Sequence, residues 1–347
     1  MRVMVAMSGG VDSSVAAAVL RDAGHDVTGV TLKLWGGDSD SGCCSVSDVD
    51  DARRVAQQLG IDHVVFNFGA DFDEHVVAPY VADHAAGRTP NPCIECNRHL
   101  KFERLARRAE ALGFDAVATG HHARVVSGPD GSLRLARGAD PAKDQSYVLY
   151  VLGARELART CFPIGSMTKA EVRARAEALG LRTAAKPDSQ DVCFITSVEG
   201  RGRFLAPRIA MRPGRVVDTA GIEVGRVDAV EMVTIGQRRG LGVAGAATPR
   251  YALDVDVETA TVVVGTAVDL RRDDTALGQM VWASGPFCGD VLAQCSAHGR
   301  PAPARLEPGP DGTGAVVRWA SPRPRVAPGQ SVVAYLDDVV VGGGVAR

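Results

Sequence analysis

Two cysteines spaced three positions apart are the first residues of this sequence that could do chemistry. Cys93 and Cys96 lie in the stretch TPNPCIECNRHLKF, residues 89–102. A zinc ribbon requires a second pair of this kind, and the sequence has none. The pair is therefore better suited to thiol catalysis, or to a metal site that other residues complete.

The residues that follow Cys96 have the apolar spacing of a helix. Apolar side chains recur three and four positions apart at Phe102, Leu105, Ala109 and Leu112, and Gly113 follows as a stop signal. We therefore expect Cys96 at the N-terminus of a helix and Cys93 in the proline-flanked loop before it. The helix dipole, together with Arg98 and Lys101, would favour the thiolate form of Cys96.

A glycine-rich turn near the N-terminus could bind phosphate. The stretch SGGVDSS, residues 8–14, follows an apolar strand pattern over residues 2–7 and leads into a helical pattern over residues 13–24. Gly9 and Gly10 permit a tight turn and close approach to a ligand. The amide groups at the start of the helix favour an anion. The lysine of a Walker A loop is absent, and a purely structural turn is the alternative.

Two further stretches could take part in chemistry or binding. Cys193 follows a polar run in KPDSQDVCFI, residues 186–195, although an isolated cysteine is more often a small core residue. Residues 201–215, RGRFLAPRIAMRPGR, contain five arginines and no acidic residue. These arginines belong either to a solvated surface or to a site that contacts the phosphates of a nucleic acid.

The composition is that of an ordinary globular protein. The 347 residues are 46% hydrophobic and 23% charged, with a net charge of −2, and suffice for two or three domains. No apolar stretch reaches 18 residues, and the N-terminal apolar run is too short for a signal peptide. We therefore expect a cytoplasmic protein with no membrane partner, whose eight cysteines are reduced thiols.

Strands and helices alternate up to about residue 200, and this alternation must position the turn and the thiols. The patterns predict further strands over residues 26–35, 62–68 and 114–120, and helices over 48–60 and 98–113. Such βαβ units predict an α/β fold with a Rossmann-like parallel sheet, which binds ligands at the carboxyl ends of its strands. Later, short Gly-, Pro- and Val-rich runs predict two small β domains. The predicted domains are residues 1–204, 205–270 and 271–347.

Seven motifs occur in a characteristic order: SGGVDSS, TPNPCIECN, ATGHHAR, KDQSYVL, KPDSQDVCFI, TIGQRRGLG and APGQ. From residue 3 to about residue 345 the sequence resembles the tRNA-specific 2-thiouridylase family. The resemblance implies a PP-loop ATP-pyrophosphatase domain and two small β domains, the last a β-barrel. It implies an enzyme, a tRNA-uridine 2-sulfurtransferase, that uses ATP and Mg²⁺. This enzyme adenylates the 2-carbonyl of the wobble uridine and replaces its oxygen with sulfur, giving 2-thiouridine. The implied partners are tRNA and a sulfur donor, such as a cysteine desulfurase or a sulfur-relay protein.

The resemblance also implies roles for particular residues. Cys193 matches the cysteine that carries a persulfide, and Cys96 matches the nucleophile that ends in a disulfide with it. The implied ATP-binding residues are Ala6, Met7, Ser8, Gly9, Gly10, Val11, Asp12 and Ser13, with Leu32 and Gly120 beside the adenosine. Asp12 would serve magnesium or the pyrophosphate, and Ser14 would add a donor. The implied tRNA contacts are His121, Lys143, Asp144, Gln145 and Gln330. We further predict that the arginines of 201–215, Arg238 and Arg239 help the β domains to hold the tRNA.

The sequence departs from the family pattern in three places. Cys93 stands where many members have Asp, so Cys93, Cys96 and Cys193 could instead hold a [4Fe–4S] cluster with one open iron for sulfide. The His of the family's G-x-H-x-G is missing, since this stretch has Gly225, Val227 and Ala229. The basic-aromatic run of the last domain is replaced by residues 294–303. The last two changes leave the tRNA contacts of the β domains open.

Two other functions are compatible with the glycine-rich turn alone. A ligase that adenylates a small molecule would need no cysteine pair, so its activity would survive replacement of Cys96 and Cys193. A non-catalytic tRNA-binding protein would consume no ATP when tRNA is present. Neither function explains three thiols that the motifs place beside an ATP loop.

Overall fold

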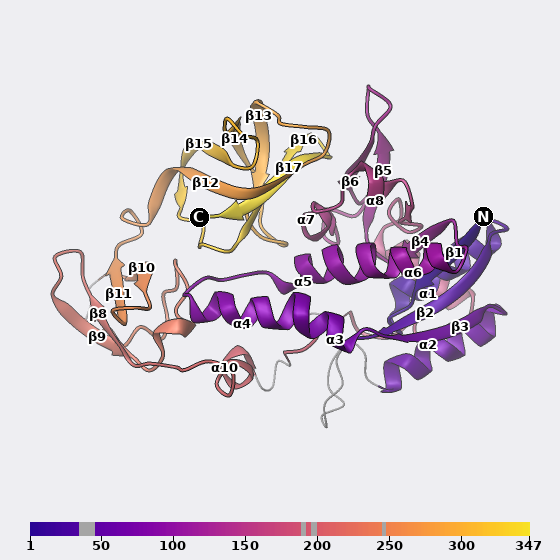
Figure 1. The fold of residues 1–347 in the computed structure, drawn as a ribbon, viewed down its shortest axis with the longest axis horizontal. Helices are drawn as coiled ribbons and strands as arrows, with labels where there is room; N and C mark the ends of the chain where they lie inside the picture. Colours follow the sequence, from indigo (N-terminus) through magenta and orange to yellow (C-terminus); the bar gives the residue numbers. More distant parts are fainter. Residues whose placement is uncertain (35–45, 189–191, 196–199, 245–247) are drawn as a thin grey trace. The chain divides into compact units, whose positions relative to one another are not determined.

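The computed structural model describes residues 1–34, 46–188, 192–195, 200–244 and 248–347 (Figure 1). The chain forms two compact units, which are described one at a time. Unit 1 comprises Met1–Val77, Pro92–Val198 and Asp338–Val340. Unit 2 comprises Ala78–Asn91, Glu199–Asp337 and Val341–Arg347. Cys43 and Cys44 lie outside the described residues.

Unit 1 is built on a five-stranded parallel sheet with the order β3–β2–β1–β4–β7. The strands are β1 (Arg2–Ala6), β2 (Asp26–Lys33), β3 (Asp62–Asn67), β4 (Ala116–Thr119) and β7 (Thr160–Cys161). The predicted Rossmann-like fold is therefore confirmed. The chain runs outward from β1 to β3 and then returns to the other side of β1, at β4. Such a switch point opens a crevice at the carboxyl ends of the strands, where ligands of this fold class bind.

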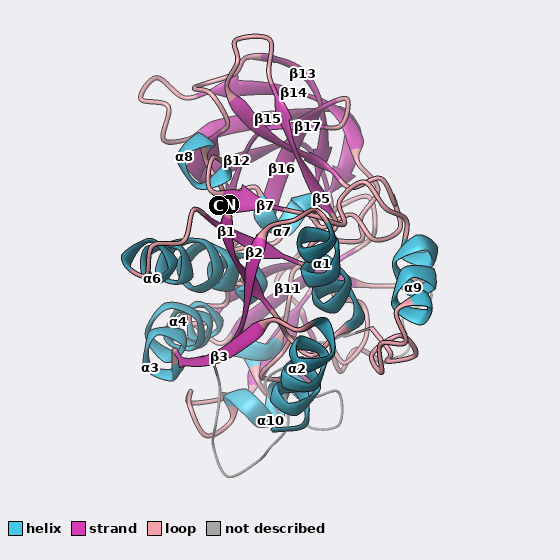
Figure 2. Cartoon of the chain, turned by 90° about the vertical axis from the view of Figure 1, so that its right-hand side faces the viewer, coloured by secondary structure: helices cyan, strands magenta, loops and turns pink. Residues whose placement is uncertain are grey.

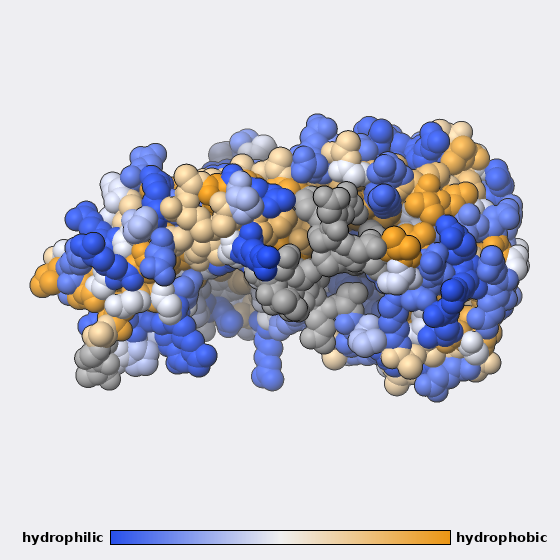
Figure 3. All heavy atoms as spheres, turned by 90° about the horizontal axis from the view of Figure 1, so that it is seen from below, coloured by the Kyte–Doolittle hydropathy of each residue, from blue (hydrophilic) through white to orange (hydrophobic). Residues whose placement is uncertain are grey.

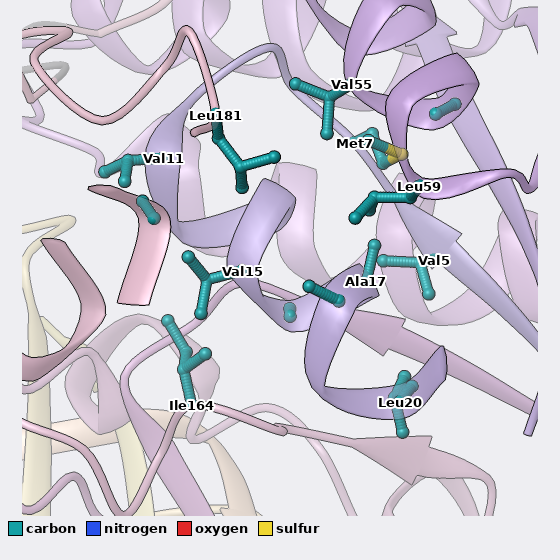
Figure 4. Packing of buried hydrophobic residues seen from close by; sticks show 14 of the residues in the cluster. Val5, Met7, Val11, Val15, Ala17, Leu20, Val55, Leu59, Ile164 and Leu181 are labelled. Atoms are coloured by element: carbon teal, nitrogen blue, oxygen red, sulfur yellow. The ribbon is translucent and has the colours of Figure 1, made fainter. Parts of the chain in front are cut away.

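Helices cover both faces of this sheet (Figure 2). On one face lie α1 (Val11–Asp22), α2 (Val46–Leu59) and α9 (Lys169–Ala178). Their apolar side chains form the main core of unit 1 with β1, and Figure 4 labels Val5, Met7, Val11, Val15, Ala17, Leu20, Val55, Leu59, Ile164 and Leu181. Helix α1 ends as predicted at Gly24, whose positive φ of 81° lets its N–H reach Arg21 O.

The helix that carries the two cysteines packs on the other face of the sheet. It begins at Pro92 and consists of α5 (Pro92–Glu95), the π-helical segment η2 (Cys96–Arg104) and α6 (Leu105–Ala111). The prediction that Cys93 lies in a loop was wrong. Proline fits the first position of a helix, where its missing N–H would have no partner. Cys93 is therefore in the first turn and Cys96 one turn later. The predicted stop at Gly113 is confirmed by its φ of 76°.

A short hairpin, β5 (Ala123–Ser127) and β6 (Leu133–Arg137), was not predicted. It belongs to unit 1 and follows directly after β4. Residues 338–340 also belong to unit 1, and Val339 pairs with Ala136 of this hairpin. The hairpin thus begins directly after the loop that follows β4, and Val339 pairs with its second strand.

Unit 2 contains two β structures. The first is a four-stranded sheet of β8 (Gly214–Val217), β9 (Glu223–Val227), β10 (Tyr251–Asp256) and β11 (Thr261–Gly265). The second consists of β12 (Arg271–Trp282), β13 (Gly289–Gln294), β14 (Ala302–Pro308), β15 (Ala315–Pro324), β16 (Ser331–Leu336) and β17 (Val339–Ala346), of which Val341–Ala346 belongs to unit 2. Leu277 in β12 pairs with Ala346 in β17, so the first and last of these six strands are joined and the sheet closes into a barrel. The predicted β-barrel at the end of the chain is therefore confirmed.

Apolar side chains that remain exposed are scattered along the chain. Val64 and Val65 are 38% and 41% exposed on β3, an edge strand of the parallel sheet, and Ile222 and Val268 are exposed in unit 2. The face drawn in Figure 3 is mostly hydrophilic, with its apolar residues in separate groups. None of the helices in the described ranges combines the length and the low charge that a membrane span needs.

A buried histidine lies in α4 (Ala78–Ala85) of unit 2, which packs against α10 (Gly200–Leu205). His84 is 2% exposed, and its ring lies 4.6 Å from that of Tyr80, which in turn packs 6.3 Å from the ring of Phe204. Burial lowers the pKa of His84 to about 4, and the positive charge of Arg201 acts in the same direction. His84 is therefore neutral at physiological pH.

We expect the protein to lose stability as the pH falls from about 6.5 to about 4. In the unfolded chain His84 binds a proton near pH 6.5, but in the folded chain only near pH 4. The neutral form of His84 thus contributes fully to the free energy of unfolding above pH 6.5. Below pH 4 the loss of this contribution lowers the free energy of unfolding by at most about 3 kcal/mol. Urea unfolding at several pH values measures this slope. His84→Gln should flatten the dependence, and an unchanged slope in this variant would contradict the assignment.

Candidate nucleotide and thiol site

The glycine-rich turn lies between β1 and α1, at the carboxyl edge of the parallel sheet. Gly9 has a positive φ of 71°, and a Cβ there would lie 2.4 Å from Asp48 O, so glycine is required. The hydroxyls of Ser13 and Ser14 donate to Gly10 O over 3.2 and 2.8 Å. The N-cap residue of α1 is Gly10, which has no side chain to cap the helix. Its first amide groups are therefore suited to an anion.

The loop that follows β4 touches the first turn of α1. A Cβ at Gly120 would lie 2.5 Å from Ser13 N and 2.7 Å from the carbonyl carbon of Asp12. Leu32 lies near the carboxyl end of β2 and is buried. The nucleotide-binding residues implied by the resemblance, which follow or end β1, β2 and β4, are thus gathered at the switch point of the sheet. Their individual contacts with ATP stay predictions.

We expect Gly120→Ala to weaken binding of an ATP analogue about tenfold and to cost about 1–3 kcal/mol of stability. The added methyl group would overlap the backbone of Ser13, so the loop or α1 must move. Calorimetric titration and thermal unfolding measure the two effects. Gly202→Ala is a matched control, since a Cβ there would meet, among the described residues, only Met232 Cε at 3.8 Å. Equal affinity for the analogue in both variants would contradict the prediction.

Asp12 lies at the start of α1 and is bonded to a lysine from a distant helix. Lys169 Nζ donates to both carboxylate oxygens of Asp12, at 2.7 and 2.8 Å, and His122 Nε2 lies 3.3 Å away. Burial alone would raise the pKa of Asp12, but the hydrogen bonds from His122 and Lys169 outweigh it and hold that pKa below its ordinary value. Asp12 is therefore ionised at neutral pH. His122 Nδ1 is buried and has no hydrogen-bond partner among the described residues.

A second carboxylate continues this network of alternating charges. Asp188 accepts from Lys169 and Lys143 at 2.8 Å each, and from Arg173 at 2.7 Å. Burial acts against these contacts, yet the lysines lower the pKa of Asp188 strongly. The side chain of Lys169 is only 11% exposed, so its charge is held between two carboxylates close to the glycine-rich turn.

A second lysine ties the turn to α2. Lys186 Nζ donates to Gly9 O at 3.0 Å, to Asp48 at 2.7 Å and to Asp51 at 2.9 Å. Burial would lower the pKa of Lys186, but the two aspartates raise it overall. Its ammonium group is therefore charged and lies against the backbone of the predicted phosphate loop.

Neither lysine was predicted as a site residue, although the sequence contains a local signal for each. Lys169 is the first residue of α9, and Thr168 and Glu171 form a capping box around it. The pattern T-K-A-E could therefore have identified the helix start. Lys186 is the first residue of the motif KPDSQDVCFI, in which only Cys193 was predicted to take part in chemistry.

The residues at the switch point fit ATP and Mg²⁺. The uncapped helix N-terminus and two charged lysines suit a triphosphate, while the ionised carboxylate of Asp12 suits a hard cation. Magnesium commonly takes one or two carboxylates and completes its shell with water and phosphate oxygens. When bound, ATP would supply an adenylyl group to an acceptor oxygen.

The three thiols of the prediction differ in exposure. Cys96 is buried, Cys93 is exposed, and Cys193 is half-buried. Among the described residues, no group of three or more His, Cys, Asp and Glu side chains is arranged to hold a metal ion. The three cysteines all belong to the described part of the chain, so they do not form a ready site for a [4Fe–4S] cluster. The structure does not support that hypothesis.

The segment of Cys193 and the helix of Cys96 share a neighbour in unit 1. Phe194 packs edge-on against Phe72, with 5.5 Å between ring centroids, and Phe72 ends α3 (Gly69–Phe72). Asp71 of α3 forms an ion pair with Arg104 of η2, with 3.0 Å between the carboxylate oxygen and Nε. The two cysteine-bearing segments thus pack against the same short helix. Residues 189–191 and 196–199, on either side of Cys193, lie outside the described residues.

Asn97 anchors the π-helical segment next to Cys96. Its Nδ2 donates to Val148 O at 2.9 Å, in α7 (Ser146–Leu149), which follows the KDQ triplet. The side chain is 1% exposed, and Oδ1 has no hydrogen-bond partner among the described residues. A π-helical turn commonly marks a functional position in a helix.

Of the residues expected to contact tRNA, His121 is buried. Its Nδ1 lies 2.7 Å from Thr119 Oγ1, and its ring packs against those of Phe102 and Phe162, with 5.9 and 6.1 Å between ring centroids. Burial lowers the pKa of His121 well below its ordinary range, with Lys101 and His122 acting in the same direction. Its ring is therefore neutral. A contact between His121 and tRNA stays a prediction.

The KDQ triplet is bonded inside unit 1. Asp144 pairs with Arg137 at 2.7 Å and also accepts from Ser146. Gln145 exchanges two hydrogen bonds of 2.9 Å with the backbone of His122, and Lys143 binds Asp188. These contacts fasten the loop that follows β4. Contact of Lys143, Asp144 and Gln145 with tRNA stays a prediction, as does that of Gln330, whose side chain binds Thr89 O in unit 2.

Several of the arginines in residues 201–215 stabilise unit 2. Arg201 donates to Met232 O at 2.9 Å, Arg212 pairs with the buried Glu231 at 2.9 Å, and Arg215 donates to Thr261 at 3.0 Å. In contrast, Arg238 and Arg239 are exposed, and neither guanidinium has a hydrogen-bond or ion-pair partner among the described residues. These two arginines are therefore better placed for phosphate contact.

Three protein-family models match the chain in succession. They are described as the tRNA methyl transferase HUP domain at residues 1–197, the tRNA methyl transferase PRC-barrel domain at 202–266, and the aminomethyltransferase beta-barrel domain at 274–346. Among solved structures, the U34-tRNA thiolase NcsA of Methanococcus maripaludis, with its [4Fe-4S] cluster, is 19% identical. It has a TM-score of 0.37 and the match covers 55% of this chain and 61% of that chain. This likeness is too distant to bear on the iron–sulfur question.

Curated relatives match the chain from end to end. The tRNA-specific 2-thiouridylase MnmA of Roseiflexus sp. (strain RS-1) is 48% identical over 374 residues, which cover 100% of this chain and 99% of the relative. That of Mycobacteroides abscessus is also 48% identical, over 97% of this chain and 96% of the relative. At this identity and coverage, the chain belongs to the tRNA-specific 2-thiouridylase family.

Proposed function

We propose that this chain is an ATP-dependent sulfurtransferase that converts the wobble uridine of tRNA to 2-thiouridine. The observation that carries the proposal is that one unit contains both a glycine-rich turn with two charged lysines and two cysteine-bearing segments. The glycine-rich turn, Lys169 and Lys186 form a phosphate cradle. The segments of Cys96 and Cys193 pack against the same short helix. The end-to-end similarity to 2-thiouridylases supports the choice of substrate.

The cradle binds the phosphates of ATP while the uridine is adenylated. The 2-carbonyl oxygen of uridine is a poor leaving group, and adenylation makes it part of AMP, which leaves readily. The oxygen attacks the α-phosphorus of ATP, and pyrophosphate departs. The amide groups at the start of α1, with Lys169 and Lys186, hold the pyrophosphate portion and offset its growing charge. When magnesium is bound, the ionised carboxylate of Asp12 would hold it beside the phosphates.

The two cysteines then deliver the sulfur. A sulfur donor, such as a cysteine desulfurase or a sulfur-relay protein, leaves a persulfide on Cys193. Its terminal sulfur attacks C2 of the uridine, its proton passes to water, and AMP departs with the oxygen. The Cys96 thiolate then attacks Sγ of Cys193, the S–S bond breaks, and 2-thiouridine is released. The resulting Cys96–Cys193 disulfide must be reduced by a thiol before the next turnover. Such chemistry suits the cytoplasm, where thiols are kept reduced.

The β domains bind the tRNA. Arg238 and Arg239 follow the TIGQ motif and are exposed, which suits contact with phosphates. Phosphate contacts of this kind make affinity fall as salt rises. The KDQ triplet, bonded next to the loop after β4, is a further candidate for contact close to the reacting base.

The test is to incubate the purified protein with ATP, Mg²⁺, a cysteine desulfurase with cysteine as the persulfide donor, a thiol reductant and a tRNA transcript that carries a wobble uridine. Nucleosides from the digested tRNA are then analysed for 2-thiouridine, and AMP and pyrophosphate are measured. We expect 2-thiouridine and AMP in equal amounts. Adenylation of a small molecule without thiolation would favour the ligase alternative, and tRNA binding without ATP consumption would favour a binding protein. Iron-free protein should be fully active.

A further inference from the structure

The residues just ahead of the cysteine helix belong to unit 2, although Cys93 and Cys96 belong to unit 1. Unit 2 includes Ala78–Asn91, and the helix starts at the next residue, Pro92. This stretch contains Thr89, which precedes Cys93 by four positions. Two motifs that the nucleotide site does not use, TIGQ and APGQ, both bind Thr89.

The APGQ turn binds the backbone of Thr89 from both sides. Thr89 N donates to Pro328 O at 2.8 Å, and the side-chain amide of Gln330 donates to Thr89 O. Gly329 permits this approach, since a Cβ there would lie 3.1 Å from Thr89 N, and its φ of 90° favours glycine. The side chain of Gln330, expected from the resemblance to contact tRNA, is thus engaged within the protein.

The TIGQ motif binds the side chain of the same residue. Thr89 Oγ1 donates to Thr234 Oγ1 at 3.2 Å. Thr234 is itself held by Gln237, whose Oε1 accepts from Thr234 N at 3.1 Å and whose N–H donates to Thr234 O at 2.9 Å. Thr89 is therefore held at three atoms, by residues from two parts of the chain that lie about 95 positions apart.

The chain between Thr89 and the helix is unusually stiff. Its sequence is Thr-Pro-Asn-Pro, residues 89–92. Each proline fixes its own φ, and each also restricts the residue before it. All four residues have limited freedom, so the position of Thr89 restrains the start of the cysteine helix.

We propose that Thr89 is a positioning residue, through which the APGQ turn and the TIGQ motif set the geometry of the Cys93–Cys96 turn. The β domains thereby couple their contact with tRNA to the thiol chemistry. Gln330 acts through Thr89 in this scheme and does not touch the substrate. The inference rests on the proposed role of Cys96, but its test includes measurements that need neither tRNA nor turnover.

The test compares Gln330→Met with Gln294→Met in the full-length protein. Gln294 is a matched control, because its amide donates to carbonyls of Ser296 and Ala297 within the same barrel. Each variant is treated with N-ethylmaleimide without tRNA, and the alkylation rate of Cys96 is followed by peptide mass spectrometry. Thiolation then gives kcat and the KM for tRNA at several salt concentrations.

For Gln330→Met we expect faster alkylation of the buried Cys96 and a lower kcat, each by about threefold to tenfold, as one lost hydrogen bond allows. The KM for tRNA and its salt dependence should not change. A raised KM with unchanged alkylation would instead make Gln330 a tRNA contact and overturn the proposal. Equal effects of Gln294→Met would also overturn it, since general loosening of the barrel would then explain them.

A second set of variants covers the case in which Gln330→Met does not fold. Thr89→Val and Thr234→Val remove the same hydroxyl pair, so the double variant should alkylate no faster than either single variant. Thr89→Ser keeps the hydroxyl and should behave as the unmodified protein. Additive effects of the two valines, or no effect of either, would overturn the proposal.

Discussion

Cys96→Ser and Cys193→Ser should each lower the rate of 2-thiouridine formation by about 10³-fold or more. A serine hydroxyl at position 193 cannot carry a persulfide, and a hydroxyl at position 96 is far too weak a nucleophile to cleave one at neutral pH. Adenylation should survive in both variants, because the phosphate cradle contains neither cysteine. Nucleoside analysis of the tRNA and pyrophosphate release, measured in parallel, separate the two steps.

Cys93→Ser is the matched control for this prediction. Cys93 is exposed in the first turn of the same helix, whereas Cys96 is buried one turn later. We expect Cys93→Ser to keep more than about a tenth of the activity, since it exchanges one small exposed side chain for another. If all three serine variants were equally inactive and the active protein contained iron, the cluster hypothesis would replace the persulfide mechanism. Retained activity of Cys96→Ser would contradict its role as the nucleophile.

Lys169→Met should reduce adenylation by about 10²-fold, the usual effect of removing one charged donor at a site of developing negative charge. Lys169 bonds both oxygens of Asp12 and also contacts Asp188, with little exposure to solvent. Its loss leaves two carboxylates without their shared cation and removes a charge that suits pyrophosphate. Exchange of pyrophosphate into ATP, measured over a range of ATP concentrations, gives kcat and KM.

The pH dependence of this variant distinguishes a direct role from a structural one. Lys169 helps to hold the pKa of Asp12 below its ordinary value, against the effect of burial. Without Lys169 the pKa of Asp12 should rise, so activity should begin to fall at a higher pH as the solution is acidified. Lys143→Met is the matched control, because Lys143 also binds Asp188 but does not bond Asp12. Equal effects of the two variants on the KM for ATP would contradict the prediction.

Local features of the fold could be predicted because their signals lie in short stretches. Apolar alternation identified the strands of the parallel sheet, and the glycines at positions 24 and 113 stopped their helices as expected, since each adopts a positive φ. The start of the cysteine helix was misplaced for a local reason as well. Proline is common both in loops and at the first position of a helix, so residues 89–92 alone did not distinguish the two.

Contacts between distant residues could not be predicted in this way. Lys169 and Asp12 are 157 positions apart, and Gln330 and Thr89 are 241 apart, so periodicity within a window carries no information about either pair. The neutral state of His121 likewise depends on its burial against the rings of Phe102 and Phe162.

The sequence alone therefore determined which chemical groups this protein brings to its reaction: a glycine-rich phosphate turn and thiols at characteristic spacings. Only the tertiary structure decided which charges surround that turn, which cysteine is buried, and which residues hold Thr89. The reason is physical. Backbone conformation responds to neighbours within a few residues, whereas burial, charge pairing and pKa depend on groups that meet only after the chain has folded.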